Sequence, residues 1–153
     1  MTSISGECLK LSRMELRDIK DVVSIEKLSF GKSWSSQIFQ QMLVSPSVEV
    51  WVATQNEFLL GYAVLTCVRD EAELTNIAVR QGERNRGIGS TLLSKVLAVA
   101  VGRNVENIFL EVRSSNQVAI SLYERFGFHL AGKRKGYYRK PTEDALILSK
   151  ALE

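Results

Sequence analysis

A turn containing glycine and arginine joins a strand-like segment to an apolar, helix-like one. The strand-like residues are Asn76–Val79, the turn runs from Gly82 to Gly89, and apolar residues then recur at helical spacing as far as Val101. A helix start presents unpaired N–H groups and a positive dipole end, which suits a phosphate or pyrophosphate. Gly87 and Gly89 have no Cβ to keep such a ligand from the backbone. Considered alone, the turn fits a plain helix start equally well.

Two familiar nucleotide-binding motifs do not fit this turn. Gly82 and Gly87 have the spacing of a P-loop, but Ile88 and Gly89 stand where that motif needs Lys and Ser or Thr. Gly87-x-Gly89 could begin a dinucleotide-binding fingerprint, but Leu92 replaces its third glycine. ATP hydrolysis and NAD binding are therefore disfavoured.

Glu111 is a candidate general base. It lies in the strand-like segment Phe109–Arg113, where alternation places it on the opposite face from Leu110 and Val112. A carboxylate in so apolar a strand needs water, a partner or a ligand. The competing interpretation is a solvated side chain, or one paired with Arg113.

Tyr123 follows Asn116 by seven residues, two helical turns, so both side chains lie on one helix face. A phenol with a pKa of about 10 stays protonated at neutral pH and can donate to a leaving thiolate, whose pKa is about 8.5. The alternatives are structural: Asn116, or Ser115, caps the helix, and Tyr123 is a core aromatic before the closing Gly127.

Composition excludes several classes of protein. The chain has 153 residues, 45% hydrophobic and 24% charged, which predicts one globular domain over residues 1–153. The net charge of +3 does not require a nucleic-acid partner. Cys8, Cys67 and the sole histidine, His129, cannot form a disulfide framework or a His/Cys zinc site, so we expect no metal and a reducing, cytoplasmic compartment. His129 lies in a strand-like stretch and fits an ordinary strand residue better than a catalytic one.

No apolar run approaches the roughly 20 residues that cross a bilayer. The start, Met1–Ser5, lacks a charged region followed by an apolar core. We therefore expect neither a membrane anchor nor a signal peptide.

Periodicity predicts an α/β (α+β) fold. The order strand, two helices, three strands, helix, strand, helix, two strands implies a central mixed, mostly antiparallel sheet of about seven strands flanked by about four helices. The predicted strands are 8–14, 48–54, 59–68, 73–79, 108–112, 128–138 and 144–152, and the predicted helices are 16–28, with Asp18 as its cap, 36–44, 87–102 and 116–126.

Several motifs in order resemble a known family. Arg84-x-x-Gly87-x-Gly89 after Asn76–Val79 resembles motif A of the GNAT superfamily of acetyl-CoA-dependent N-acetyltransferases. Other segments resemble its RimI-type branch, the bacterial acetyltransferases of a ribosomal protein N-terminus. They are Ser29-Phe30, Trp34-Ser35, Asp70-Glu71-Ala72, Leu110–Asn116, Ala119–Phe128, Tyr137-Tyr138 and Glu143-Asp144-Ala145. The resemblance spans about Leu11 to Leu152 and implies the GNAT fold.

The resemblance also assigns the co-substrate site. It implies that the backbone of Ile77, Ala78 and Val79 pairs with the pantetheine arm of acetyl-CoA like an extra strand, and that Asn116 contacts the arm. The pyrophosphate is wrapped by the turn residues Arg84, Asn85, Arg86, Gly87, Ile88 and Gly89, assisted by Ser90.

The catalytic and acceptor residues follow in the same way. The resemblance makes Glu111 the general base and Tyr123 the general acid. Glu73 occupies a position where a related eukaryotic N-terminal acetyltransferase has a second catalytic group, although RimI-type proteins vary there. It is a backup base that also fits a solvated strand residue, as does Glu71. The peptide groove is lined by Phe30, Trp34, Tyr137 and Tyr138.

Three positions depart from the family pattern: Ser33 and Gly82 replace prolines, and Glu73 replaces a smaller or imidazole-bearing residue. They bear on the shape of the peptide groove, not on co-substrate use. A basic run, Lys133, Arg134, Lys135, Arg139 and Lys140, fits a solvated strand face better than an RNA-binding surface.

The sequence thus predicts direct transfer of acetyl from acetyl-CoA to the α-amine of a protein, and the resemblance indicates a small-subunit ribosomal protein. An α-amine is favoured because its pKa, about 7.7 to 8.0, is lower than that of lysine, about 10.4. Two alternatives stay open: a GNAT enzyme that acts on lysine or a small amine, and a non-catalytic acyl-CoA-binding module on a ribosome. Nucleic acid is not required, and a monomer is the expectation.

Overall fold

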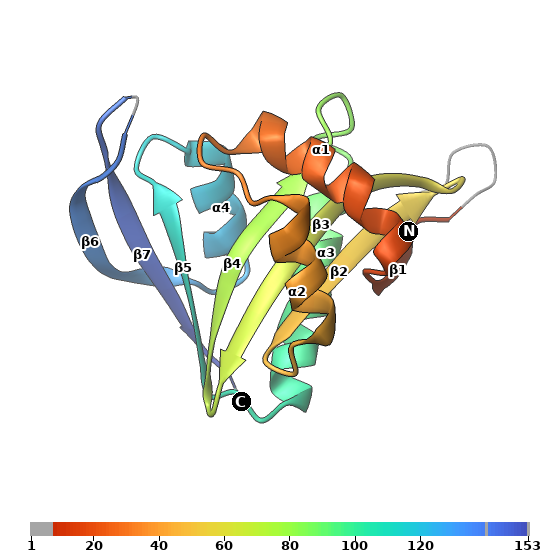
Figure 1. Cartoon of the computed structure of the whole chain (residues 1–153). Coiled ribbons are helices and arrows are strands. Elements are labelled where there is room, and N and C mark those ends of the chain that lie inside the picture. Colours follow the sequence, from red (N-terminus) through yellow and green to blue (C-terminus); the bar gives the residue numbers. More distant parts are fainter. Residues whose placement is uncertain (1–7, 140, 153) are drawn as a thin grey trace.

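A seven-stranded sheet in the order β1-β2-β3-β4-β5-β7-β6 forms the centre of the molecule (Figure 1). The computed structural model describes residues 8–139 and 141–152, so the N-terminal start Met1–Ser5 and Lys140 lie outside the described residues. The strands are β1 (Lys10–Arg13), β2 (Val48–Gln55), β3 (Phe58–Val68), β4 (Glu71–Val79), β5 (Asn107–Arg113), β6 (His129–Tyr138) and β7 (Glu143–Ala151). The helices are α1 (Ile19–Ser29), α2 (Ser36–Val44), α3 (Ile88–Gly102) and α4 (Gln117–Arg125).

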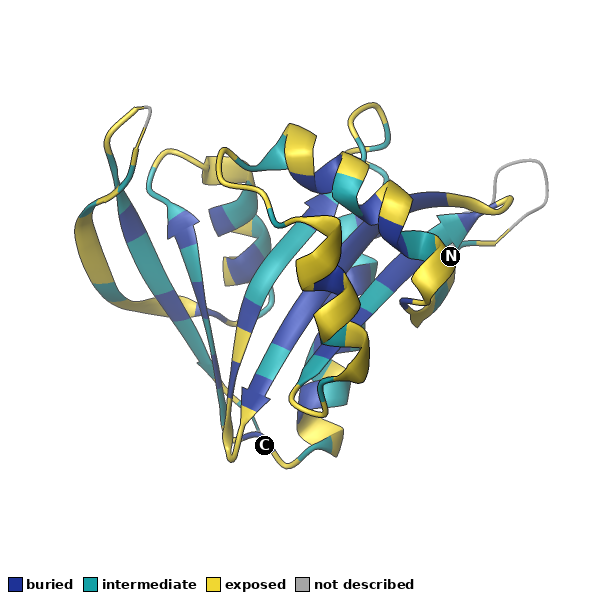
Figure 2. Cartoon of the chain, viewed as in Figure 1, coloured by how far each residue is buried: buried dark blue, intermediate teal, exposed yellow. Residues whose placement is uncertain are grey.

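Helices cover both faces of the sheet. Helices α1 and α2 lie on one face over a buried cluster that includes Phe39, Tyr62 and Val64. Helices α3 and α4 lie on the other face over a larger cluster that includes Leu92 and Leu110. The central strands are mostly buried and the outer surfaces of α1 and α2 are exposed (Figure 2). Below, these are the α1/α2 face and the α3/α4 face.

The predicted architecture is confirmed: residues 8–139 and 141–152 form a mixed sheet of seven strands with four α-helices, and among these strands only β4 and β5 pair in parallel. Helix α3 makes the crossover between them. The differences from the predicted boundaries are local. Strand β4 begins at Glu71 instead of Glu73, and Leu16–Asp18 forms a separate 3-10 turn before α1 instead of the first turn of that helix. Asp18 is at the N-cap position of α1, but its carboxylate accepts the N–H of Glu15 (2.8 Å) and does not cap α1.

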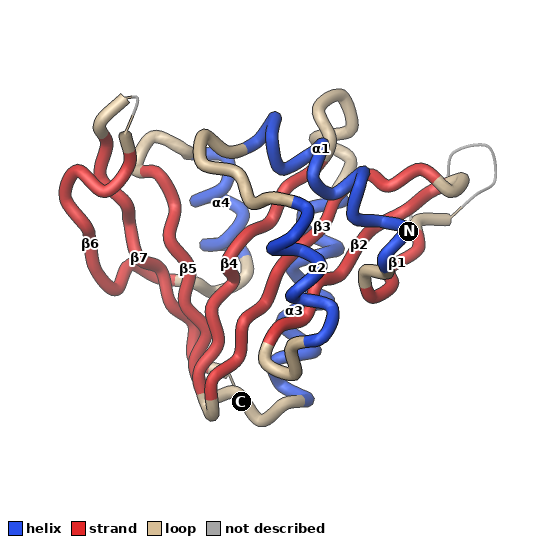
Figure 3. The backbone as a smooth tube through the Cα atoms, in the orientation of Figure 1, coloured by secondary structure: helices blue, strands red, loops and turns tan. Residues whose placement is uncertain are grey.

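Strands β4 and β5 pair only at their first residues and then separate. The parallel pairs are Glu71–Asn107, Ala72–Ile108 and Glu73–Phe109. In β4, consecutive residues of β3 face Asn76 and Leu74, so Thr75 is an extra residue, a β-bulge. Figures 1 and 3 show the two strands close at their starts and apart at their ends. The bulge bends β4 away from β5 and leaves two strand edges facing a gap.

Candidate active site

The turn before α3 has the geometry of an anion site. Gly87, with a φ of 79°, is the N-cap residue, and the first intrahelical bond runs from the N–H of Thr91 to Gly87 O (3.0 Å). No side chain caps this end and no acidic residue occupies the first turn. The amides of Ile88, Gly89 and Ser90 therefore have no intrahelical acceptor, and the first turn holds no negative charge against the positive end of the helix.

Two arginines of the predicted turn are already engaged. Arg86 is paired with Glu83 and donates to Gln55 Oε1 (2.7 Å), so its guanidinium braces the turn. Arg84 is exposed and donates from Nε to Val79 O (3.3 Å). Asn85 has a φ of 66°, as a tight turn requires. Ile88, the first residue of α3, has its side chain buried in the core, so only its backbone faces the turn.

The last residues of β4 offer a free backbone edge to a ligand. Ala78 and Val79 pair with Tyr62 and Gly61 of β3, and Ile77 pairs with Ala63. On the β5 side these β4 residues have no partner strand within residues 8–139 and 141–152. Apart from Val79 O, which accepts from Arg84 Nε, their edge groups can therefore bond an extended molecule lying in the gap, as a further strand would.

Asn116 and Tyr123 lie on α4, beside the gap on the α3/α4 face. Asn116 is the N-cap of α4, and its Oδ1 accepts the N–H of Ala119 (3.2 Å), which confirms Asn116 over Ser115 as the cap. Gly127, with a φ of 92°, follows the end of the helix as predicted. The Nδ2 of Asn116 has no partner in the described chain and stays available to a ligand.

Tyr123 has a buried ring and a hydroxyl that reaches the surface. The residue is 6% exposed and packs edge-on against Phe128 (5.8 Å between ring centroids). Its hydroxyl has no hydrogen-bond partner among the described residues. In the same residues, every side-chain N or O atom that is fully buried does have a partner. The hydroxyl oxygen must therefore be accessible. Burial, and secondarily Tyr138, raises the pKa of Tyr123 above its usual value, which keeps the phenol protonated.

Glu111 points to the α1/α2 face, as its strand alternation predicts, since Leu110 and Val112 are buried on the other face. Its structural partner is Arg134, whose Nε lies 2.8 Å from Glu111 Oε2. Arg113, the partner considered from the sequence, instead contacts Glu143 (3.1 Å). Arg134 lies two strands away on β6 and reaches across β7.

Glu73 lies on the same face as Glu111, one strand away. Partial burial of its carboxyl and the negative charge of Glu111 raise the pKa of Glu73, and Arg134 opposes them. Glu71, at the start of β4, is exposed and has no ion-pair or side-chain partner among the described residues. The structure thus places Glu73, but not Glu71, in the electrostatic surroundings of the candidate base.

Tyr137 and Tyr138, at the end of β6, pack against each other near Glu111. Their rings are edge-on, with centroids 5.1 Å apart, and the Arg134 guanidinium lies 5.2 Å from the Tyr137 ring. The negative charge of Glu111 is the largest influence that raises the pKa of Tyr137, and burial is the largest for Tyr138. Both tyrosines are therefore close to the candidate base.

Phe30 and Trp34 lie in the segment between α1 and α2, on the same face. Both are half-buried and pack on the α1/α2 cluster, with the Trp34 ring edge-on to Phe39 (5.8 Å). The structure thus brings Phe30, Trp34, Glu73, Glu111, Tyr137 and Tyr138 to one face of the sheet. Tyr123 is on the opposite face, across the gap.

Sequence reasoning missed two features of this site. Arg134 was predicted only as part of a solvated basic face, because its approach to Glu111 depends on the strand order β5-β7-β6. Glu26 of α1 is buried and accepts hydrogen bonds from Tyr62, Asn76 and Trp34. The acidic residue at an apolar position of a predicted helix was the available signal for Glu26.

Other candidate chemistry lies elsewhere or is not supported. His129 is exposed at the start of β6, with Nε2 3.4 Å from Ser149 Oγ. Cys67 is buried, which raises the pKa of its thiol, and Cys8 is exposed; neither forms a disulfide. Among the described residues no cluster of His, Cys, Asp or Glu could hold a metal ion. In the same residues, no helix is long and apolar enough to span a membrane.

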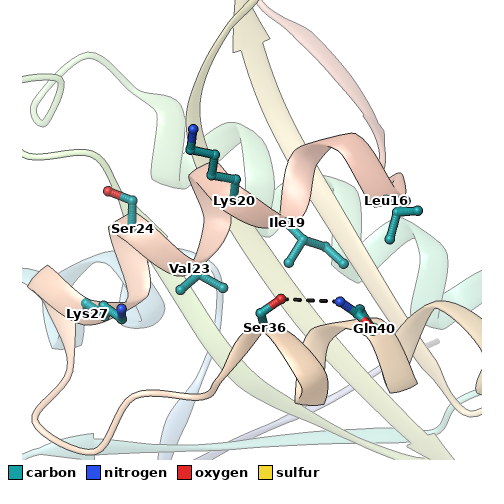
Figure 4. Close-up of a pocket in the computed structure, with 8 residues that line it drawn as sticks. All are labelled: Leu16, Ile19, Lys20, Val23, Ser24, Lys27, Ser36 and Gln40. Atoms are coloured by element: carbon teal, nitrogen blue, oxygen red, sulfur yellow. Dashed lines mark hydrogen bonds between the residues drawn. The ribbon is translucent and has the colours of Figure 1, made fainter.

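A groove of about 530 Å³ lies between α1 and α2. Figure 4 shows its lining, where Gln40 donates to Ser36 Oγ (3.4 Å). None of the candidate catalytic residues lines this groove: its walls are Leu16, Ile19, Lys20, Val23, Ser24, Lys27, Ser36 and Gln40. It is separate from the gap between β4 and β5.

Comparison with known proteins gives consistent matches. The acetyltransferase (GNAT) family matches residues 19–128. A putative [ribosomal protein bS18]-alanine N-acetyltransferase of Bacillus subtilis is 36% identical over 136 residues, covering 88% of this chain and 90% of that protein. The crystal structure of the ribosomal-protein-S18-alanine N-acetyltransferase from Escherichia coli is 32% identical, covers 95% of each chain and has a TM-score of 0.88. An acetyltransferase from Elizabethkingia anophelis with acetyl-CoA bound shares the fold, at 22% identity, coverage of 94% and 98%, and a TM-score of 0.76.

Proposed function

Because the chain belongs to the acetyltransferase (GNAT) family, we propose that it transfers the acetyl group of acetyl-CoA to the free α-amine of a protein N-terminus. One observation supports this best. A carboxylate, Glu111, and a protonated phenol, Tyr123, flank the gap between β4 and β5 from opposite faces of the sheet. Amide formation from a thioester needs a proton acceptor at the amine and a proton donor at the sulfur, and the two side chains supply one of each.

The residues beside the gap fit acetyl-CoA. The uncapped start of α3, from Gly87 to Ser90, offers amide donors to the pyrophosphate, and exposed Arg84 adds positive charge. The free edge of Ile77, Ala78 and Val79 offers donors and acceptors to the amide-containing pantetheine arm. Asn116 Nδ2 lies at the start of α4 on the same side. Asn85, Arg86 and Ile88 support the turn rather than contact the ligand through their side chains.

The mechanism is direct attack with both substrates bound. Acetyl-CoA supplies the acetyl group as a thioester. Glu111 accepts a proton from the attacking amine, directly or through water, as the N–C bond forms. Tyr123 donates its proton to the sulfur as the C–S bond breaks, so one proton enters the protein at Glu111 and one leaves it at Tyr123.

Arg134 occupies the place that a cationic amine would take. Its guanidinium is 2.8 Å from Glu111, and its side chain is 56% exposed. An incoming ammonium would replace it at the carboxylate and lose one proton to water there, which leaves the neutral amine that attacks. Arg134 can then turn toward Glu73, whose pKa it already influences. Glu73 serves as a counter-charge in this proposal, and Glu111 remains the base.

The amine pKa favours an N-terminus over lysine. Neutralising a lysine with a pKa near 10.4 rather than an α-amine near 8.0 costs about 3.3 kcal/mol more at neutral pH. The relatives named for [ribosomal protein bS18]-alanine acetylation suggest an alanine N-terminus on a ribosomal protein. We therefore expect action in the cytoplasm on such a protein, by a monomer, since one chain supplies both Glu111 and Tyr123.

The test uses acetyl-CoA and three peptides that begin with alanine: one free, one blocked at its N-terminus, and one free but without lysine. Mass spectrometry should show one added acetyl on the free and the lysine-free peptides and none on the blocked one. Acetylation of the blocked peptide would instead establish a lysine acetyltransferase. Binding of acetyl-CoA without transfer to any peptide would contradict the proposed function and favour the acyl-CoA-binding module.

A further inference from the structure

Glu26 is a buried carboxylate that the proposed chemistry does not use. It lies on α1 with 1% of its surface exposed, and no cation pairs with it in the described chain. Its oxygens accept three hydrogen bonds: from the Tyr62 hydroxyl, from Asn76 Nδ2 (2.9 Å) and from the backbone N–H of Trp34 (2.9 Å). Three donors make a buried charge tolerable, but such a group is weak as a source of stability.

The three donors come from three separate elements. Tyr62 lies on β3, Asn76 on β4, and Trp34 in the segment between α1 and α2. Burial and the Glu26 carboxylate raise the pKa of Tyr62, so Tyr62 stays a donor. Among the described residues, the Glu26 carboxylate is the one group that connects the 30–35 segment to the centre of the sheet through hydrogen bonds.

An aromatic contact runs beside this polar one. The Trp34 ring is edge-on to Phe39 (5.8 Å), and Phe39 is edge-on to Tyr62 (6.0 Å). The aromatic path fixes the Trp34 side chain, and Glu26 fixes its backbone. Together they determine where the 30–35 segment lies over the sheet.

Asn76 links this anchor to the gap. It immediately follows the bulge residue Thr75 and precedes Ile77–Val79, the free strand edge. The bulge is what turns Asn76 toward α1, since Leu74 faces the other cluster. A displacement of Glu26 would therefore shift the 30–35 segment relative to the edge beside which the acetyl group would lie.

We propose that Glu26 is a positioning residue that aligns the acceptor peptide with the acetyl group by locking the 30–35 segment to the β4 bulge. This inference rests on the proposed function, because it assumes that Phe30 and Trp34 line the acceptor groove. It assigns Glu26 a role in acceptor alignment and none in proton transfer or in binding of acetyl-CoA.

The test compares Glu26→Ala and Glu26→Gln with Glu49→Ala. Glu49 is a matched control: it is also buried (8% exposed) and also accepts from several donors, Trp51 Nε1 (2.9 Å) and Arg103 (2.7 Å), but it lies on β2 away from the 30–35 segment. The readouts are peptide KM, kcat, the Kd of acetyl-CoA, and hydrogen exchange of the Trp34 amide.

Glu26→Ala should raise peptide KM about tenfold, the equivalent of about 1.4 kcal/mol, and leave the Kd of acetyl-CoA unchanged. Glu26→Gln should recover part of this loss, because its amide oxygen can still accept the Trp34 N–H. Exchange of the Trp34 amide should accelerate most in Glu26→Ala, less in Glu26→Gln and not at all in Glu49→Ala. Glu49→Ala should lower stability without changing peptide KM.

Equal effects of Glu26→Ala and Glu49→Ala on peptide KM would overturn the proposal, because stability alone would then explain them. An increase in the Kd of acetyl-CoA as large as the increase in peptide KM would also overturn the proposal. If Glu26→Ala does not fold, Glu26→Gln decides through the same readouts. If the wild type acetylates no peptide, the proposed function fails, while Trp34 exchange in the two Glu26 variants still decides whether Glu26 anchors the segment.

Discussion

At the residue scale, the proposed division of labour between Glu111 and Tyr123 can be tested separately from binding. Glu111→Gln removes the proton acceptor and Tyr123→Phe the donor, so each should lower kcat by about 10²- to 10⁴-fold. Neither change removes a group from the α3 turn or the β4 edge. The Kd of acetyl-CoA, measured by calorimetry, should therefore stay at its wild-type value.

Glu71→Gln is the control for this pair, because Glu71 is an exposed carboxylate on the same strand face as Glu73 and should leave kcat unchanged. Wild-type rates in Glu111→Gln or Tyr123→Phe would contradict the assignment. Since burial raises the pKa of Tyr123, its deprotonation should not lower kcat below pH 10.

Sequence alternation predicted which way Glu111 points but not what it contacts. The face of a strand residue follows from local geometry, whereas the approach of Arg134 depends on β6 lying outside β7. For Tyr123, too, the sequence predicted the direction of the side chain but not its surroundings. Helical spacing placed it with Asn116, but only the packed structure shows a buried ring with an accessible hydroxyl.

At the element scale, helix α3 packs so closely on the sheet that one position of β3 admits only glycine. A Cβ on Gly61 would lie 2.8 Å from Ala78 O and 3.2 Å from Leu92 Cδ1. Gly61→Ala should therefore lower the free energy of unfolding by about 1–3 kcal/mol and disturb the β4 edge. Urea denaturation measures the first effect and acetyl-CoA affinity the second.

Gly102→Ala is the matched control, since Gly102 ends α3 and a Cβ there meets nothing within 4 Å. It should be neutral or slightly stabilising. A Gly61→Ala protein as stable as Gly102→Ala would show that α3 and β4 can separate without cost.

Glu143, at the start of β7, forms hydrogen bonds with the end of β5 and with the segment that leads into α4. Glu143 accepts from the backbone N–H of Ser115 (2.6 Å), from Ser114 Oγ (3.2 Å) and from Arg113 (3.1 Å). Hydrogen bonds from Ser115 are the main cause that lowers the pKa of Glu143 to about 2, from an ordinary value of 4.5. A lowered folded-state pKa stabilises the fold above pH 4.5, and this stabilisation is lost as pH falls toward 2.

Glu143→Gln should therefore lower Tm at pH 7, and the difference from wild type should shrink as pH falls from 4.5 toward 2. Thermal unfolding followed by circular dichroism at several pH values measures this. Glu124→Gln, an exposed change on α4, should show no such trend. A difference in Tm that stays constant with pH would rule out the proposed role of the Glu143 charge.

At the scale of the whole molecule, we propose that the chain is one domain, because one sheet carries both buried clusters. Its element order was predictable, since long periodic segments specify type and sequence order. The separation of β4 from β5 was not, because the consecutive polar residues Thr75 and Asn76 interrupt the alternation of β4 without showing which neighbouring strand the chain leaves. The site therefore depends on the feature that periodicity could not reveal.

Acetyl-CoA that fills this gap should stabilise the entire fold. A ligand at 100 times its Kd adds about 2.7 kcal/mol to the free energy of unfolding, which for a domain of this size raises Tm by about 5–10 °C. Differential scanning fluorimetry with and without acetyl-CoA measures the shift. Adenosine alone, which lacks the pantetheine arm, is the control and should give a much smaller shift in Tm. A shift equal to that of acetyl-CoA would show that the pantetheine arm, and therefore the gap, does not contribute to binding.

The free edges of β4 and β5 also determine how the reaction ends. In the proposed complex their hydrogen-bonding groups bind the carrier arm and not the acetyl group, so they would hold the molecule as firmly after transfer as before it. The spent carrier is then a competitor for the next molecule of acetyl donor. Turnover in cells would follow the ratio of acetylated to free coenzyme A, and the modification would report the acetyl supply of the cell.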